Sequence, residues 1–188
     1  MNIIIIGAQA SGKMTIGQEL EKLIQATLIH NHETIDFVLK FIPDFTSDMV
    51  ELNSRICFDI YDVFAKYGRD LITTALVDFN DSNQVGFLEI VQNLFHQHKR
   101  EVLFVELDAS LEERLRRNKT ENRLKHKPLK RHIDISESEI LDTSERCRYT
   151  TDEIPSFIQH YYKINNTHLS AEEVAELIFE KITELEKN

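Results

Sequence analysis

Three features are scarce in this sequence of 188 residues, and each scarcity argues against a class of protein. The only two cysteines, Cys57 and Cys147, lie far apart without metal or redox spacing, so we expect free thiols in a cytoplasmic protein. No run of eighteen apolar residues occurs, which argues against a membrane-spanning helix, and the N-terminus predicts a strand rather than a signal peptide. The 22 basic residues are outnumbered by 32 acidic ones, and the net charge of -10 argues against a nucleic-acid partner held by overall charge.

The sequence does contain a phosphate-binding signature at its start. Residues 2–6 (Asn-Ile-Ile-Ile-Ile) are typical of a strand buried on both faces, and the next seven residues have the spacing of a glycine, four residues and Gly-Lys. In such a loop the backbone N–H groups point at phosphate oxygens, the following helix adds its positive end, and the lysine adds a cation. The alternative is a plain strand-to-helix turn. The residues expected to bind nucleotide phosphates are Gly7, Ala10, Ser11, Gly12, Lys13, Met14 and Thr15.

One position departs from this signature. After the lysine the motif has a serine or threonine whose hydroxyl binds magnesium, whereas this chain has Met14. A thioether is a poor ligand for a hard cation that prefers oxygen. Thr15 follows directly, but neighbouring residues on a helix point about 100° apart, so its hydroxyl is not expected to replace the missing one.

The order of apolar and polar segments predicts one α/β domain over residues 1–188. Because strands alternate with helices of crossover length, we expect a parallel sheet with helices on both faces and the functional groups at the carboxyl ends of the strands. Ser110 and Ser170 are predicted helix caps, as is Ser136 with Glu139. Predicted strands cover 2–6, 26–31, 70–77, 101–107 and 158–164, and predicted helices cover 13–25, 34–41, 48–67, about 82–98, a basic stretch from 111, a stretch from about 136, and 171–187.

A cationic segment interrupts an otherwise acidic chain. Residues 114–131 hold nine lysines or arginines and one acid, whereas the rest holds 13 basic and 31 acidic residues. Such a local concentration indicates an anion site, and the alternative is a solvated basic helix face. The segment has no interleaved aromatic residues for stacking nucleic-acid bases.

Nearly the whole chain resembles the P-loop kinases of small molecules, which include nucleoside monophosphate kinases, shikimate kinase and antibiotic phosphotransferases. The resemblance lies in the N-terminal loop, in 103–117 (Leu-Phe-Val-Glu-Leu, then Leu-Glu-Glu-Arg-Leu-Arg-Arg) and in 164–175. Gly-Lys-Met-Thr, His-Asn-His-Glu-Thr-Ile-Asp and Asn-Arg-Leu-Lys-His-Lys-Pro are similar to a bacterial ATP-binding branch. The resemblance implies a three-layer αβα P-loop NTPase fold, a five-stranded mostly parallel sheet, acceptor-covering helices at about 34–67 and an Arg/Lys-rich lid at about 117–135.

The resemblance also implies roles for residues outside the loop. Arg123 and Arg131 would neutralise the transferring phosphoryl group from the lid, because phosphoryl transfer depends mostly on positioning and charge neutralisation. At the base of the lid, one of two arginines would stack on the nucleotide base or contact a phosphate, and an asparagine would lie in the base loop. The residues in these roles are Arg114, Arg117 and Asn166, with Arg146 and Arg148 completing the site.

The acceptor is expected at the end of the second strand. On an extended segment, His30 and His32 would face the same side, and Asp36 would lie one helical turn beyond His32. His32 or Asp36 could then receive the acceptor's proton, and the alternative is local hydrogen bonding at the strand-helix junction. By resemblance, the acceptor-binding residues would be His30, Asn31, Arg55 and Thr73. Asp78, Glu106 and Asp108 end strands where a metal could bind through water, but no residue is assigned as a metal ligand.

These observations predict an ATP-dependent kinase that transfers the γ-phosphoryl group to a small-molecule hydroxyl or phosphate. The implied cofactors are ATP, or another nucleoside triphosphate, and Mg²⁺. The alternative, indicated by Met14 and by the missing carboxylate on the third strand, is a nucleotide-binding switch or sensor with little transfer chemistry. The sequence does not identify the acceptor.

Overall fold

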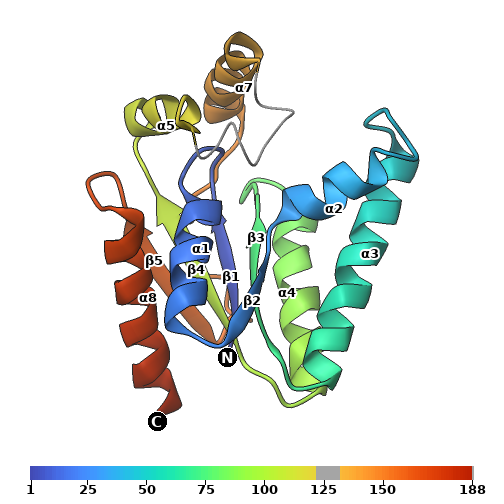
Figure 1. Ribbon diagram of the computed structural model, residues 1–188, viewed down its shortest axis with the longest axis vertical. Helices are drawn as coiled ribbons and strands as arrows, with labels where there is room; N and C mark the ends of the chain where they lie inside the picture. The colour runs from blue at the N-terminus through green and yellow to red at the C-terminus, as the bar shows by residue number, and fades with distance from the viewer. Residues whose placement is uncertain (122–131, 188) are drawn as a thin grey trace.

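The computed structural model describes residues 1–121 and 132–187. Five parallel strands form one sheet in the order β2-β3-β1-β4-β5, with helices on both faces (Figure 1). This confirms the predicted three-layer α/β architecture. The strands are β1 (Asn2–Gly7), β2 (Ala26–Ile29), β3 (Asp70–Ala75), β4 (Val102–Asp108) and β5 (His160–Asn165). The described helices are α1 (Lys13–Leu23), α2 (Asn31–Val38), α3 (Ser47–Lys66), α4 (Ser82–Gln97), α5 (Leu111–Asn118), α7 (Ile133–Arg146) and α8 (Ala171–Glu186).

The isoleucines of β1 form the centre of two cores. Ile3 and Ile5 pack with residues of α1 and α8 on one face of the sheet, whereas Ile4 and Ile6 pack with residues of α3 and α4 on the other. All four are buried, as expected for a central parallel strand covered on both faces. This packing fixes the end of β1, and therefore the start of the loop at Gly7, against β3 and β4.

The helices begin where the sequence supplies side-chain caps. The Ser110 hydroxyl accepts the N–H of Glu113 at the start of α5, and Ser170 forms a capping box with Glu173 at the start of α8. Both caps confirm the predicted helix starts. Helices α5 and α7 lie beyond the carboxyl ends of the strands, on the same side of the sheet as the loop between β1 and α1 (Figure 1).

Several predicted boundaries are wrong. Residues 30–32 are not extended, because α2 begins at Asn31 and the Glu33 carboxylate accepts the N–H of His30 at 3.0 Å. The third strand ends at Ala75 rather than at residue 77. Ser136 is not a helix cap, since α7 begins earlier and the Ser136 hydroxyl donates to Oδ1 of Asn118 at 2.8 Å.

Two further points bear on the expectations above. Within the described residues, no helix combines the length and the apolar character needed to cross a membrane. The predicted lid arginines Arg123 and Arg131 lie in 122–131, outside the described residues.

Candidate nucleotide-binding site

The loop between β1 and α1 has a backbone shape that ordinary residues rarely adopt. Gly7 and Gly12 have φ angles of 144° and 103°, and Ala10 has a φ of 59°. Alternation of left-handed and right-handed residues turns successive N–H groups toward one side, which forms an anion-binding concavity. Gly12 directly precedes α1, so the positive end of that helix adds to the same side. A Cβ atom on Gly7 would lie 2.6 Å from the carbonyl oxygen of Leu107, which explains the glycine there.

Lys13 lies within the loop rather than in solvent. Its Nζ donates to the carbonyl oxygens of Gly7 at 2.5 Å and Ala8 at 2.7 Å, and the residue is buried. The side chain therefore folds back over the loop, beside the space that phosphates would fill. The ammonium can exchange these carbonyl oxygens for phosphate oxygens without leaving the loop.

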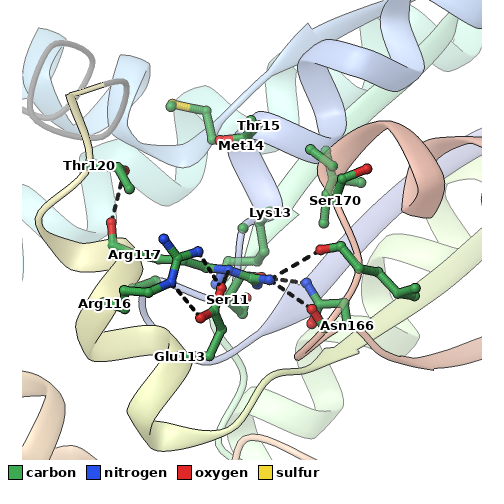
Figure 2. Close-up of a pocket in the computed structure, with 15 residues that line it drawn as sticks. Ser11, Lys13, Met14, Thr15, Glu113, Arg116, Arg117, Thr120, Asn166 and Ser170 are labelled. Atoms are coloured by element: carbon green, nitrogen blue, oxygen red, sulfur yellow. Dashed lines mark hydrogen bonds and ion pairs between the residues drawn. The ribbon is translucent and has the colours of Figure 1, made fainter.

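One carbonyl oxygen joins the loop to two distant parts of the chain. The Ser11 carbonyl oxygen accepts hydrogen bonds from Nη1 of Arg117 at 2.9 Å and from Nδ2 of Asn166 at 2.8 Å (Figure 2). Arg117 also donates from Nη2 to the carbonyl oxygen of Asn166 at 2.7 Å and from Nε to Glu113 at 2.7 Å. In a trans peptide the N–H points opposite to the carbonyl. Because these hydrogen bonds hold the Ser11 carbonyl oxygen on one side of the loop, the N–H of Gly12 points to the opposite side of the loop.

Glu113 fixes the orientation of this arginine. Its carboxylate pairs with Arg116 and Arg117, three and four residues further along α5. Hydrogen bonding to Arg116, followed by hydrogen bonding to Arg117, lowers the pKa of Glu113 to about 2 despite the opposing effect of burial. Glu113 is thus ionised throughout the neutral range. No role was assigned to Glu113 from the sequence, although its i,i+4 spacing to Arg117 is typical of an ion pair on one helix.

A cavity of about 290 Å³ opens beside the loop. Asn166 lines it and is only 1% exposed, and its Oδ1 has no hydrogen-bond partner among the described residues. Because the Ser11 carbonyl fixes Nδ2 as the donor, Oδ1 is an acceptor that can receive an N–H or O–H from a ligand. The residues lining the cavity are Ala10, Ser11, Gly12, Lys13, Met14, Thr15, Ile16, Glu113, Arg116, Arg117, Thr120, Asn166, Leu169, Ser170 and Ala171 (Figure 2).

Arg114 is placed differently from Arg117. It is 7% exposed, and Nη2 donates to the Ser144 hydroxyl at 2.9 Å, whereas Nε and Nη1 have no hydrogen-bond partner among the described residues. Burial lowers the pKa of Arg114, and the nearby groups of Tyr149 and Asp108 act in the opposite direction. A buried guanidinium with two uncompensated nitrogens is able to bind an anion. Of the other arginines predicted to complete the site, Arg146 pairs with Asp142 and Arg148 pairs with Asp152, both at exposed positions.

The described acidic, histidine and cysteine side chains near the loop do not form a metal-binding cluster. Met14 is 5% exposed, and its thioether points away from Lys13 (Figure 2). Glu106 is fully buried, where it forms an ion pair with Lys163 at 2.9 Å and accepts the N–H of Thr151 at 2.9 Å and the Tyr161 hydroxyl. In residues 1–121 and 132–187, no group of three or more His, Cys, Asp or Glu side chains could hold a metal ion.

Asp78 is also held by local contacts. Its Oδ1 accepts the backbone N–H groups of Asn80 at 3.0 Å and Arg148 at 2.9 Å. Burial acts to raise the pKa of Asp78, but these two N–H groups and the neighbouring side chains outweigh it, so the pKa is lowered. Asp78 therefore connects the exit of β3 to the segment after α7.

The residues predicted for the acceptor lie around the end of β2. His30 and His32 have ring centroids 6.5 Å apart, with His30 buried before α2 and His32 and Asp36 on that helix. Thr73 donates its hydroxyl to the carbonyl oxygen of Ile29 at 2.8 Å, which joins β3 to β2. Asn31 accepts the Thr74 hydroxyl at 3.3 Å through Oδ1. The structure thus gathers most of these polar groups at one edge of the sheet.

Arg55, also predicted for the acceptor, differs from these residues in its exposure. It is exposed on α3, on the opposite side of the helix from buried Met49 and half-buried Asn53. The Oδ1 atom of Asn53 is buried without a hydrogen-bond partner among the described residues. Asn53, rather than Arg55, is therefore the polar residue of this stretch that faces inward.

Comparison with known proteins identifies the fold. No protein-family model matches the sequence, and no curated protein is significantly similar to it. Among solved structures, gluconokinase from Sinorhizobium meliloti has a TM-score of 0.62 at 12% identity, covering 98% of this chain and 92% of its own. APS kinase from Mycobacterium tuberculosis, in complex with AMPPNP and APS, has a TM-score of 0.58 at 13% identity, covering 97% of each chain.

Shikimate kinase from Acinetobacter baumannii, in complex with shikimate, has a TM-score of 0.53 at 17% identity, covering 97% of this chain and 93% of its own. These likenesses extend over nearly the full length of every chain compared. The protein therefore has the fold of the small-molecule P-loop kinases, as the sequence predicts.

Proposed function

We propose that the protein is an ATP-dependent phosphotransferase that acts on a small-molecule acceptor. The observation that carries the proposal is the loop from Gly7 to Lys13, whose three positive φ angles precede a helix N-terminus beside a cavity. Loop N–H groups and Lys13 would hold the phosphates, which is the charge arrangement that phosphoryl transfer requires. The fold shared with gluconokinase and shikimate kinase supports this class of reaction.

The cavity is proposed to hold the nucleoside. Arg117 uses the edge of its guanidinium for hydrogen bonds to Glu113, Ser11 and Asn166, which leaves the flat faces for stacking on a base. Asn166 Oδ1 would accept an N–H group from that base. Arg114, with two uncompensated nitrogens, would contact a phosphate.

The acceptor is proposed to bind at the end of β2. There, His32 or Asp36 would receive the proton of the acceptor hydroxyl, while His30, Asn31 and Thr73 would shape the pocket. The lid arginines Arg123 and Arg131 would neutralise the transferring group. Magnesium would be carried by the nucleotide phosphates, since the described protein groups match no magnesium donor set.

A nucleotide-binding switch or sensor is the second candidate. Two observations favour it: Met14 replaces the metal-binding hydroxyl, and the strand-end acids Asp78 and Glu106 accept hydrogen bonds from backbone N–H groups. Such a protein would bind ATP and change shape with little turnover.

Measurement of ADP production separates the two candidates. The wild type would be assayed with nucleosides, nucleotides, shikimate-like acids, sugars and aminoglycoside or chloramphenicol-type antibiotics. We expect acceptor-dependent ADP that falls at least about a hundredfold in Lys13→Ala, because the variant loses the cation that follows the phosphates. The matched control is Lys22→Ala, since Lys22 is exposed at the far end of α1 and pairs with Glu19 on the same helix. Tight ATP binding without turnover on any acceptor would favour the switch instead.

A further inference from the structure

Position 14 is where this chain departs from the phosphate-loop motif, and its side chain is buried at the wall of the cavity. Met14 lies in the first turn of α1, next to Lys13, and is 5% exposed. Its thioether sulfur points away from Lys13 (Figure 2). A serine or threonine at this position would present a hydroxyl oxygen to a metal on the phosphates. The methionine presents methylene and sulfur instead, which Mg²⁺ binds poorly.

Two of the acids that end strands, Asp78 and Glu106, already have protein partners. Asp78 accepts two backbone N–H groups, and Glu106 is enclosed by Lys163, Thr151 and Tyr161. Releasing Glu106 to a metal would leave the buried N–H of Thr151 without this acceptor, whereas the two N–H groups that Asp78 accepts lie in exposed hydrogen bonds. Thr15 belongs to the next position of α1, about 100° around the helix axis.

Three positively charged features of the protein lie around the proposed phosphate site. Lys13 is folded over the loop, Arg114 has two uncompensated nitrogens, and the N-terminus of α1 adds its partial positive charge. These groups attract the bare nucleotide more strongly than its magnesium complex, because the metal neutralises part of the phosphate charge. With Met14 in place of the hydroxyl residue, this position gives the metal no contact that would make the magnesium complex the tighter-binding form.

We infer that nucleotide binding by this protein is uncoupled from Mg²⁺, and that Met14 is the residue responsible. The inference rests on the proposed nucleotide site. The metal that accompanies the nucleotide would keep only phosphate oxygens and water as ligands. Restoring a hydroxyl at position 14 would link the metal to the protein and make binding depend on it.

Calorimetry with ATP, in EDTA and in excess Mg²⁺, tests the inference. For the wild type we expect Mg²⁺ either to weaken ATP binding or to tighten it by less than about threefold. For Met14→Ser, and for Met14→Thr as a second variant, we expect Mg²⁺ to tighten binding about tenfold or more, in line with the effect of a single metal-positioning group. Lys22→Ala, at the exposed far end of α1, is the control, and its two dissociation constants should differ only as those of the wild type do.

Three other results of the calorimetry would each contradict a different claim. Wild-type binding that Mg²⁺ tightens tenfold would disprove the uncoupling while leaving the nucleotide site intact. Loss of such tightening in Thr15→Ala would identify Thr15 as the metal-binding residue. No ATP binding in either condition would disprove both the inference and the proposed function.

A spectroscopic measurement checks the same point without relying on affinity. Electron paramagnetic resonance of Mn²⁺ in isotopically labelled water counts the water ligands of the metal. The wild-type complex with ATP should keep the water count of free Mn²⁺–ATP. Met14→Ser should have one water fewer, because the serine hydroxyl replaces it. A missing water in the wild type would contradict the inference.

Discussion

At the scale of single residues, Gly7 and Gly86 differ in whether a residue with a side chain could replace them. Gly7 has a φ of 144°, and an added Cβ would lie 2.6 Å from the Leu107 carbonyl oxygen. Gly86, in the middle of α4, has nothing within 4 Å of the corresponding position and no positive φ. The first glycine is therefore required by the loop, whereas the second only adds freedom to the unfolded chain.

This contrast gives a matched pair of substitutions. Gly7→Ala should lower the free energy of unfolding by about 1–3 kcal/mol, because alanine is strained at this φ and collides with the backbone of β4. Gly86→Ala should raise it by about 0.5–1 kcal/mol, as alanine favours the helix. Urea denaturation at neutral pH measures both. A Gly7→Ala variant as stable as the wild type would contradict the loop geometry.

Residue patterns predict the loop well but its supports poorly. The spacing of glycines and lysine is local in sequence, so Gly7, Gly12 and Lys13 could be assigned from the chain alone. The contacts of the Ser11 carbonyl oxygen with Arg117 and Asn166 span 106 and 155 residues, respectively. Only the folded sheet brings these segments together, so no local pattern reveals them.

At the scale of elements, α5 depends on the ionised carboxylate of Glu113. Its pKa of about 2 is below the ordinary value of 4.5, so folding is favoured by the charged form. This contribution is fully present above the unfolded-state pKa, and it is lost as the pH falls from about 4.5 toward 2. Acid should therefore loosen α5 from the loop through this residue.

The prediction concerns stability in mild acid. Between pH 7 and pH 3 the wild type should lose about 1 kcal/mol more of its free energy of unfolding than Glu113→Gln, a modest value because Arg116 is exposed. Urea denaturation at the two pH values measures the difference, with Glu112→Gln as the exposed neighbouring control. Equal losses in wild type and Glu113→Gln would show that the carboxylate does not stabilise the helix.

The sequence predicts the helices and strands themselves, except where short-range hydrogen bonds set the residue at which a helix begins. Hydrophobic periodicity and caps such as Ser110 and Ser170 predict every described strand and most helix starts. The start of α2 was predicted too late because the capping contact of His30 with Glu33 involves no standard capping residue at the first position. The resulting helical turn changes the relation of His30 to His32, which is the part of the acceptor site that sequence reasoning described incorrectly.

At the scale of the whole molecule, Glu106 joins three separated segments. It lies on β4, pairs with Lys163 and accepts the hydroxyl of Tyr161 from β5, and accepts the N–H of Thr151. Burial, together with this hydrogen bond to a carboxylate, raises the pKa of Tyr161, so the phenol stays protonated and donates. The sequence placed Glu106 among candidate metal-binding acids, whereas the structure uses it to hold the sheet edge.

Substitutions of Glu106 separate these two roles. Glu106→Leu should lower the free energy of unfolding by about 2–4 kcal/mol, because the buried N–H of Thr151 loses its acceptor and the ammonium of Lys163 loses its ion pair. Glu106→Gln keeps an acceptor oxygen and should cost less. Both variants should bind ATP like the wild type under conditions where they remain folded, as judged by circular dichroism and calorimetry. A folded Glu106→Gln variant with a changed Mg²⁺ requirement would instead support the metal role.

The meeting of Arg117 and Asn166 on one carbonyl oxygen has a consequence for how ligands arrive. Two regions far from the loop in the chain already hold it in place, so entry of a nucleotide need not order it. Little conformational entropy is then lost on association, and encounter rather than rearrangement should limit the rate. The binding loop therefore has its final shape before the nucleotide binds.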